Sequence, residues 1–219
     1  MMDLKEAMEN RHSVRRYVGK DVEPEKKEAI ASLISEINAE TGMHFELHSG
    51  EPNPFTGDNR MINVRDYVAL LGTKSADLNE KAGYHGERLV LLMTQLGLDS
   101  CWIGNLPIME KTINELKSEY ELACIIAFGY GEDHGKPHEG KAMGELCRVD
   151  GEMPAWFENG MRYAMLAPTA INQQKFLFTL ESDGKVSATF GKGPYSQVDL
   201  GIAKLHFELG AGKENFEWA

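Results

Sequence analysis

The pattern of apolar and polar positions along the chain predicts a series of amphipathic helices. Pro24 suits a first helical turn, and the apolar residues from Ile30 to Ile37 recur at helical spacing. Gly97 and Gly210 each stand where a helical stripe of apolar residues stops, as a helix-ending glycine does. We therefore expect helices over about 4–10, 24–37, 80–96, 154–166 and 197–209.

Short apolar runs between these helices predict strands. The continuous run at 122–128 is typical of a central strand, and 67–71 of a shorter buried one. The runs 176–180 and 186–190 flank Ser182-Asp183-Gly184, which indicates an antiparallel hairpin. Because helices and strands are mixed and one strand pair is antiparallel, we expect an α+β layered fold. No repeat or change of composition marks a linker, so a single domain over 1–219 is expected.

Composition narrows the classes of function. With 34 acidic and 23 basic residues, the formal net charge is −11, which argues against nucleic-acid binding and basic membrane-surface proteins. The three cysteines, Cys101, Cys124 and Cys147, form no Cys-x-x-Cys pair, which argues against a disulfide framework and a structural zinc site. No signal-peptide core or bilayer-length apolar run is present. We expect a soluble cytoplasmic protein with reduced, mostly buried thiols.

A basic segment near the N-terminus is the first place that suggests chemistry. Arg11-His12-Ser13-Val14-Arg15-Arg16-Tyr17 gathers basic and hydroxyl side chains in an otherwise acidic chain. Arginine presents planar donors suited to phosphate, and alternate side chains of an extended segment point the same way. Arg11, Ser13 and Arg15 could therefore converge on one anion. On composition alone, the plainer interpretation is a solvated end of the first helix, where positive charge complements the helix dipole.

An amide-rich segment near the C-terminus is the second such place. It runs Ala167-Pro168-Thr169-Ala170-Ile171-Asn172-Gln173-Gln174-Lys175-Phe176 and joins a predicted helix to a predicted strand. Asn and Gln side chains each offer both a donor and an acceptor, so they can bind the donor and acceptor edge of a heterocycle. A capped helix-to-strand loop without a ligand explains the same residues.

Together these segments carry a family resemblance. RHSVRRY at 11–17 and APTAINQQKF at 167–176 resemble the phosphate-binding and amide motifs of FMN-dependent nitroreductases. GLDSCWIGNLP at 97–107 resembles that family's flavin-facing loop, and AFGYG with KPHEGKAMGEL its phosphate-proximal basic stretch. DLGIAKLHFELGAG at 199–212 is similar to a helix of the subgroup called putative TM nitroreductases. Two departures stand out: the amide motif comes late in the chain, and Lys175-Phe176 replaces the usual Pro-Trp.

The resemblance implies a nitroreductase-like layered fold, with a mainly antiparallel central sheet flanked by helices, and FMN as cofactor. The basic residues would hold the phosphate and ribityl chain, the amides would meet the isoalloxazine edge, and 103–104 would face the ring. Glycine there would let the backbone approach a flat ring closely. Lys141 would approach the phosphate, at a place where Gly140-Lys141 stands instead of the arginine that the family often has. The implied cofactor-binding residues are Arg11, His12, Ser13, Arg15, Ile103, Gly104, Lys141, Asn172 and Gln174.

The activity implied is an oxidoreductase that passes electrons from NAD(P)H to an electron-poor small molecule, such as a nitroaromatic or a quinone, by a ping-pong scheme. Flavin supplies the chemistry, so no catalytic side chain and no metal ligand is nominated. The family also implies a homodimer with FMN at the subunit interface. The loop-like stretch around 50–62, which includes Glu51–Asn59, is expected to shape the acceptor site.

Three other interpretations compete with this one. The plainest is a dimeric scaffold with no cofactor, which a yellow preparation with flavin absorbance would exclude. A non-catalytic flavin-binding or flavin-sensing protein would keep the FMN contacts and lack room for a second substrate. A dinucleotide-binding fold is suggested by Gly129-Tyr130-Gly131 after a buried strand, but the next residues, 132–137, do not open a helix. The dinucleotide fingerprint needs strand, glycine turn and helix in direct succession, so we reject it.

Overall fold

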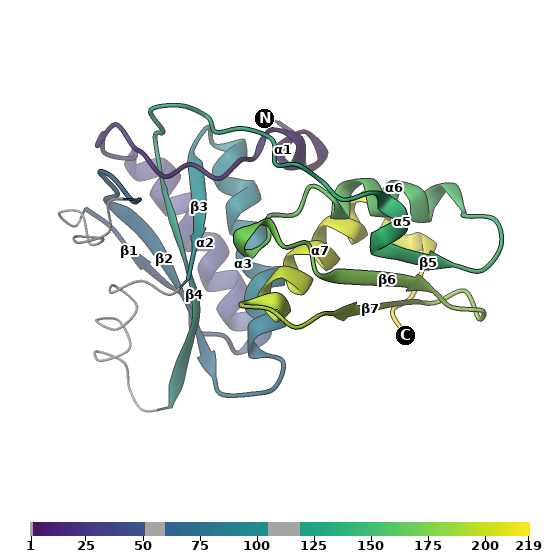
Figure 1. The fold of residues 1–219 in the computed structure, drawn as a ribbon. Coiled ribbons are helices and arrows are strands. Elements are labelled where there is room, and N and C mark those ends of the chain that lie inside the picture. Colours follow the sequence, from purple (N-terminus) through teal and green to yellow (C-terminus); the bar gives the residue numbers. More distant parts are fainter. Residues whose placement is uncertain (1, 51–59, 105–118) are drawn as a thin grey trace.

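The structure is a computed structural model, and it describes residues 2–50, 60–104 and 119–219. The loop predicted at Glu51–Asn59 lies outside the described residues. Two sheets lie on either side of a central pair of helices (Figure 1). The earlier part of the chain, through residue 129, forms most of one side, and the later part, from residue 143 onward, forms most of the other.

The larger sheet has four strands in the order β1-β2-β4-β3, and all its pairs are antiparallel. Its two central strands are buried along almost their whole length, as their continuous apolar runs predict. The strands are β1 (Glu46–His48), β2 (Asp66–Thr73), β3 (Asp99–Ile103) and β4 (Tyr120–Gly129). The mixed, mainly antiparallel fold expected from the sequence is confirmed.

Among the described residues, three helices accompany this sheet. The short α1 (Leu4–Asn10) begins at Asp3, whose side chain accepts from the Glu6 backbone N–H in a capping box. The longer α2 (Pro24–Thr41) starts with proline in its first turn and ends at Gly42 in the left-handed conformation. Helix α3 (Leu78–Gln95) packs on the sheet through β2, β3 and β4. Its apolar stripe gives this side of the molecule a buried core.

The smaller sheet has three strands in the order β5-β6-β7. Strands β6 (Phe176–Leu180) and β7 (Val186–Phe190) form the antiparallel hairpin that the sequence predicts. Strand β5 (Cys147–Val149) joins β6 in parallel and follows the single turn α5 (Met143–Leu146). Helices α6 (Ala155–Ala164) and α7 (Ser196–Ala211) pack together and enclose an aromatic core around Phe157, Phe178 and Phe207.

The two sides meet where α3 crosses α7 (Figure 1). Glycines let the two backbones approach closely at this crossing. A Cβ atom added to Gly83 would lie 2.0 Å from the Val198 carbonyl oxygen, and one added to Gly201 would lie 2.0 Å from the Glu80 carbonyl oxygen. No side chain larger than hydrogen fits at either glycine unless the helices move apart.

Among the described residues, the short elements β1, β3, α5 and β5 were not predicted from the sequence, nor were the 3-10 helices Ala170–Asn172 and Lys213–Asn215. Strand β5 forms one edge of the second, three-stranded sheet, which was itself unexpected. All three cysteines are free and buried, as predicted. In the described part of the chain no helix is long and apolar enough to cross a membrane.

Candidate functional site

A cavity of about 470 Å³ lies between the two sides of the molecule, within the size range of cofactor sites. We call it the main cavity. It brings together the basic segment, the end of β3, the amide-rich segment and the first turns of α7. Its lining residues are Ser13, Arg15, Arg60, Trp102, Ile103, Gly104, Cys124, Pro168, Thr169, Ala170, Ile171, Pro194, Tyr195, Val198, Asp199 and Ile202.

The basic segment reaches the cavity as an extended strand-like stretch. Backbone hydrogen bonds hold it between β3 and residue 62: Val14 N–H donates to Ser100 O at 2.9 Å, and Ile62 N–H donates to Arg15 O at 2.9 Å. Val14 and Tyr17 are buried in the core, and Arg15 and Arg16 between them are exposed. Ser13 and Arg15 line the main cavity, as the alternation predicts.

Arg16 points elsewhere, which the alternation also predicts. Its Nε donates to Glu132 Oε2 at 2.9 Å on an exposed surface, away from the cavity lining. Arg60 takes a place beside Arg15 instead, since both line the main cavity and a side pocket of about 120 Å³ next to it. One end of the cavity therefore carries two guanidinium groups and a serine hydroxyl, a donor set suited to phosphate.

The end of β3 forms one wall of the main cavity. Ile103 and Gly104 both line the cavity, and Cys124 Sγ donates to Ile103 O at 2.9 Å from β4 behind them. Burial raises the pKa of the Cys124 thiol to about 12, so this cysteine stays protonated. A Cβ atom on Gly104 would lie 2.4 Å from Tyr195 Cζ. Glycine at 104 thus lets an aromatic ring lie directly against the backbone, which any larger residue would prevent.

The amide-rich segment supplies the opposite wall in an unusual backbone conformation. Ile171, Asn172 and Gln174 have φ of 48°, 54° and 44°, in the left-handed region that non-glycine residues avoid. Ile171 is 86% exposed, although it is a large apolar residue at the cavity rim. Such a cluster of strained residues persists only where surrounding contacts hold it, and it is typical of ligand-binding segments.

Asp199 in the first turn of α7 is one of the residues that hold this segment. Its carboxylate accepts from Ala170 N–H at 2.9 Å and from Gln173 Nε2 at 2.7 Å. The residue lines the cavity but is only 3% exposed. Burial raises its pKa to about 6, against the opposing effect of these hydrogen bonds. Asp199 was not predicted as a site residue, because the pattern over 197–209 indicates only a helix with an apolar stripe.

Asn172, Gln174 and Lys141 form a network outside the main cavity. Gln174 Nε2 donates to Asn172 Oδ1 and to Glu139 O, both at 2.8 Å, while Gln174 Oε1 accepts from Lys141 N–H at 2.8 Å. Asn172 Nδ2 donates to Glu139 O at 2.9 Å, and Lys141 Nζ to Gln174 O at 3.0 Å. In this structure the amides therefore tie residues 139–141 to the strained segment.

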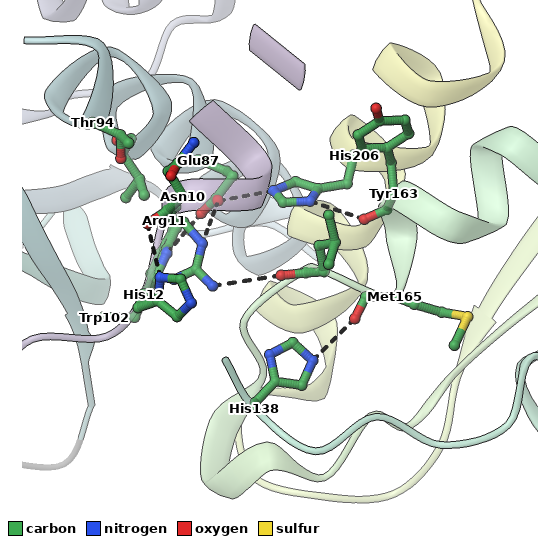
Figure 2. A network of polar contacts seen from close by, with 12 residues as sticks. Asn10, Arg11, His12, Glu87, Thr94, Trp102, His138, Tyr163, Met165 and His206 are labelled. Carbon is green, nitrogen blue, oxygen red and sulfur yellow. Dashed lines mark hydrogen bonds and ion pairs between the residues drawn. The ribbon is translucent and has the colours of Figure 1, made fainter. Parts of the chain in front are cut away.

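Arg11 and His12 lie apart from Ser13 and Arg15, at a second cavity of about 300 Å³ that His138 and Arg162 also line. The Arg11 side chain is 6% exposed, and its Nε lies 3.7 Å from Glu87 Oε1 on α3 (Figure 2). Burial lowers the Arg11 pKa, which the Glu87 carboxylate opposes. We expected Arg11 to share an anion site with Ser13 and Arg15, but its side chain lies at a different cavity. A buried charge requires a nearby partner, and Glu87 is the partner of Arg11.

Glu87 is the centre of this buried network (Figure 2). Its Oε1 contacts His206 Nε2 at 2.9 Å, and its Oε2 accepts from Trp102 Nε1 at 2.9 Å. His206 Nδ1 in turn lies 3.1 Å from Tyr163 O. Because Trp102 lines the main cavity, the network connects the cavity wall with α3, α6 and α7.

Two further observations concern metal ligands and a neighbouring cavity. Residues 2–50, 60–104 and 119–219 contain no group of three or more His, Cys, Asp or Glu side chains placed to hold a metal ion. A larger cavity of about 580 Å³ adjoins the main one at Tyr195, which lines both. Lys192 is its one charged lining residue among those described, so the donors that suit a phosphate gather in the main cavity.

Solved structures share this fold. A nitroreductase from Thermotoga maritima, described as putative, has a TM-score of 0.73 at 23% identity, covering 99% of this chain and 87% of that one. A putative nitroreductase from Desulfovibrio desulfuricans in complex with FMN has a TM-score of 0.54 at 16% identity, covering 69% of this chain and 98% of that one. A putative NADH dehydrogenase/NAD(P)H nitroreductase from Bacteroides thetaiotaomicron gives 0.52 at 19% identity, with 64% and 95% covered.

A search of the curated proteins finds no match. The family described as "Putative TM nitroreductase" matches residues 3–211, which is nearly the whole chain. The match includes both motifs and all the described residues of the main cavity. The protein therefore belongs to the putative TM nitroreductase family, a nitroreductase-like group of oxidoreductases.

Proposed function

We propose that the protein is an FMN-dependent oxidoreductase that transfers electrons from NAD(P)H to an electron-poor small molecule, such as a quinone or a nitroaromatic compound. One observation carries the proposal: the main cavity joins Ser13 and Arg15 of the basic segment to Thr169–Ile171 of the amide-rich segment, which lie far apart in the sequence. Membership of the nitroreductase family and the FMN named for one structural relative support it.

The residues present fit FMN in chemistry. Ser13, Arg15 and Arg60 would hold the phosphate, because guanidinium groups bind phosphate oxygens through paired, charge-assisted hydrogen bonds. We place the planar flavin ring at Gly104 in the position of the Tyr195 side chain, because glycine there lets an aromatic ring lie against the backbone, as the Tyr195 ring does. The backbone of 169–171 offers donors and acceptors to the ring edge.

FMN, when bound, would accept a hydride from NAD(P)H and pass electrons on, so the protein needs to bind, orient and shield it. The two substrates would use the same space in turn, which gives a ping-pong scheme. Arg60 and the neighbouring Met61, in the stretch expected to shape acceptor binding, line the side pocket beside Arg15. Free, buried cysteines are consistent with our proposal of a cytoplasmic setting. The homodimer that the sequence resemblance implies stays a prediction.

Purification with excess FMN, followed by gel filtration, tests cofactor binding. We expect a yellow protein that releases FMN on denaturation, at a fixed ratio of flavin to protein. Oxidation of NADPH or NADH with a quinone should then exceed the rate with the same concentration of free FMN. A flavoprotein without such turnover would support the alternative, a flavin-binding or flavin-sensing protein, and a preparation that takes up no flavin would contradict both.

A further inference from the structure

The side chain of Tyr195 stands between the main cavity and the larger cavity beside it, and it lines both of them. We call the larger one, of about 580 Å³, the neighbouring cavity. Its described lining comes mainly from β4, the end of β7 and the first turn of α7. Tyr195 is half-buried, so its ring packs against the protein without being enclosed by it.

On the side of the main cavity, the phenol ring lies directly on the backbone of Gly104. A Cβ atom added to Gly104 would lie 2.4 Å from Tyr195 Cζ, 2.5 Å from its Cε2 and 2.7 Å from its hydroxyl oxygen. All three atoms belong to the outer end of one side chain. The tyrosine ring therefore fills the place that we assign to the flavin ring, and the two rings cannot occupy that place together.

The backbone that carries this ring is held on both sides. Tyr195 has a φ of 56°, in the left-handed region, and its carbonyl oxygen accepts from Asp199 N–H at 2.9 Å. The carbonyl oxygen of Pro194 accepts from Gln173 Nε2 at 2.7 Å. Because these contacts fix the main chain, the ring can leave Gly104 by rotation about its own side-chain bonds, between rotamers, without movement of the loop.

The neighbouring cavity gives the ring a second place to lie. Its volume is in the range that holds whole small-molecule ligands, so it has room for a single phenol ring. A tyrosine hydroxyl needs a hydrogen-bond partner where it is buried, and the side-chain amides of Asn79 and Gln197 line this cavity. Phe190, which is 44% exposed, adds an aromatic surface.

We infer that Tyr195 is an aromatic gate with two positions. In one position its ring lies on Gly104; in the other it lies in the neighbouring cavity, and only the second position admits the flavin ring. The measured flavin affinity is then reduced by the fraction of molecules whose gate is open. The identity of the incoming ring as flavin rests on the proposed function, whereas the two positions of Tyr195 rest on the contacts and cavities described above.

Removal of the ring tests the gate through flavin affinity. Tyr195→Gly keeps the left-handed backbone, which glycine adopts readily, and uncovers Gly104. It should bind both FMN and riboflavin at least about threefold more tightly than the unchanged protein, because no ring has to be displaced. Tyr195→Phe retains a ring and should stay close to the unchanged protein, as should Phe190→Ala, which alters the neighbouring cavity alone. Equal or weaker flavin binding by Tyr195→Gly would show that the ring is a fixed wall and would overturn the inference.

A double-variant comparison of stability needs no flavin. Gly104→Ala puts a methyl group where the tyrosine ring lies, and a movable ring should give way to it. The denaturant midpoint should therefore fall by the same amount when Gly104→Ala is made in the unchanged protein and in Tyr195→Gly. A larger fall in the protein that keeps the ring would show that the ring cannot turn away, and it would overturn the inference. Because these midpoints are measured without flavin, a protein that takes up no flavin would contradict the proposed function, and the comparison would still decide whether Tyr195 can move.

Discussion

Arg15 and Arg16 are neighbours with different surroundings, and they give the clearest test at the scale of single residues. Arg15 lines the main cavity, while Arg16 pairs with Glu132 on the surface. Arg15→Ala should weaken FMN binding by about 1.5–3 kcal/mol, the range for a hydrogen bond to a charged group, and leave riboflavin binding nearly unchanged. Arg16→Ala is the matched control, since equal losses from both variants would show that the assignment of the phosphate end is wrong. Titration of flavin fluorescence measures both ligands.

Arg11 should behave differently, because its charge is buried beside Glu87 and lies outside the lining of the main cavity. Arg11→Ala leaves the Glu87 carboxylate buried with fewer partners, which we expect to lower the free energy of unfolding by about 3–5 kcal/mol. Arg162→Ala, which breaks the exposed pair with Glu158, should change it by less than about 0.5 kcal/mol. Urea unfolding measures both values. A selective loss of FMN over riboflavin in Arg11→Ala would instead show direct contact with the phosphate.

Asp199 makes stability depend on pH. Its pKa is raised from 3.8 to about 6 in the folded protein, so folding favours the protonated carboxyl. Its contribution to stability is full below the unfolded pKa and is lost as pH rises through about 6. Relative to Asp199→Asn, the unchanged protein should therefore lose roughly 2–3 kcal/mol between pH 4 and pH 7. Thermal or urea unfolding of both proteins across this range measures the difference, and a constant difference would contradict the raised pKa.

At the scale of elements, the glycines of the helix crossing give the sharpest prediction. In a free helix, Gly→Ala gains up to about 1 kcal/mol. At Gly83 the new methyl group would meet the Val198 carbonyl, so Gly83→Ala should lower the free energy of unfolding by about 1–3 kcal/mol or more. Gly144→Ala in α5 is the matched control, because no atom lies within 4 Å of its added Cβ. Equal stability of the two variants would contradict the close crossing.

The elements also show which parts of the structure a sequence can predict. The hairpin β6-β7 was predicted with its observed bounds, because alternation and a Ser-Asp-Gly turn are local signals. Strand β3 was missed because it begins with two polar residues, Asp99 and Ser100, which leaves only a short apolar run. Its pairing with β4 is what identifies it as a strand. Strand β1 has three residues, all half-buried, so it carries almost no pattern of its own.

The candidate site divides in the same way. Ser13, Arg15, Ile103 and Gly104 were predicted and line the main cavity, because strand alternation and motif resemblance place them. The separation of Arg11 depends on Glu87 of α3, a partner that no local pattern identifies. Arg60 and Asp199 were missed for the same reason, since only the fold brings an irregular stretch and a helix N-terminus to one cavity.

At the scale of the whole molecule, the crossing of α3 and α7 affects how the protein can change in evolution. Gly83 and Gly201 leave room for the two backbones to cross, and Gly86 leaves room for Trp102 at the main cavity. A larger side chain at any of these glycines would push the helices apart or displace the cavity wall. Exposed residues on either side carry no such restriction, so we expect the two sides to diverge in surface sequence while the crossing itself keeps its glycines.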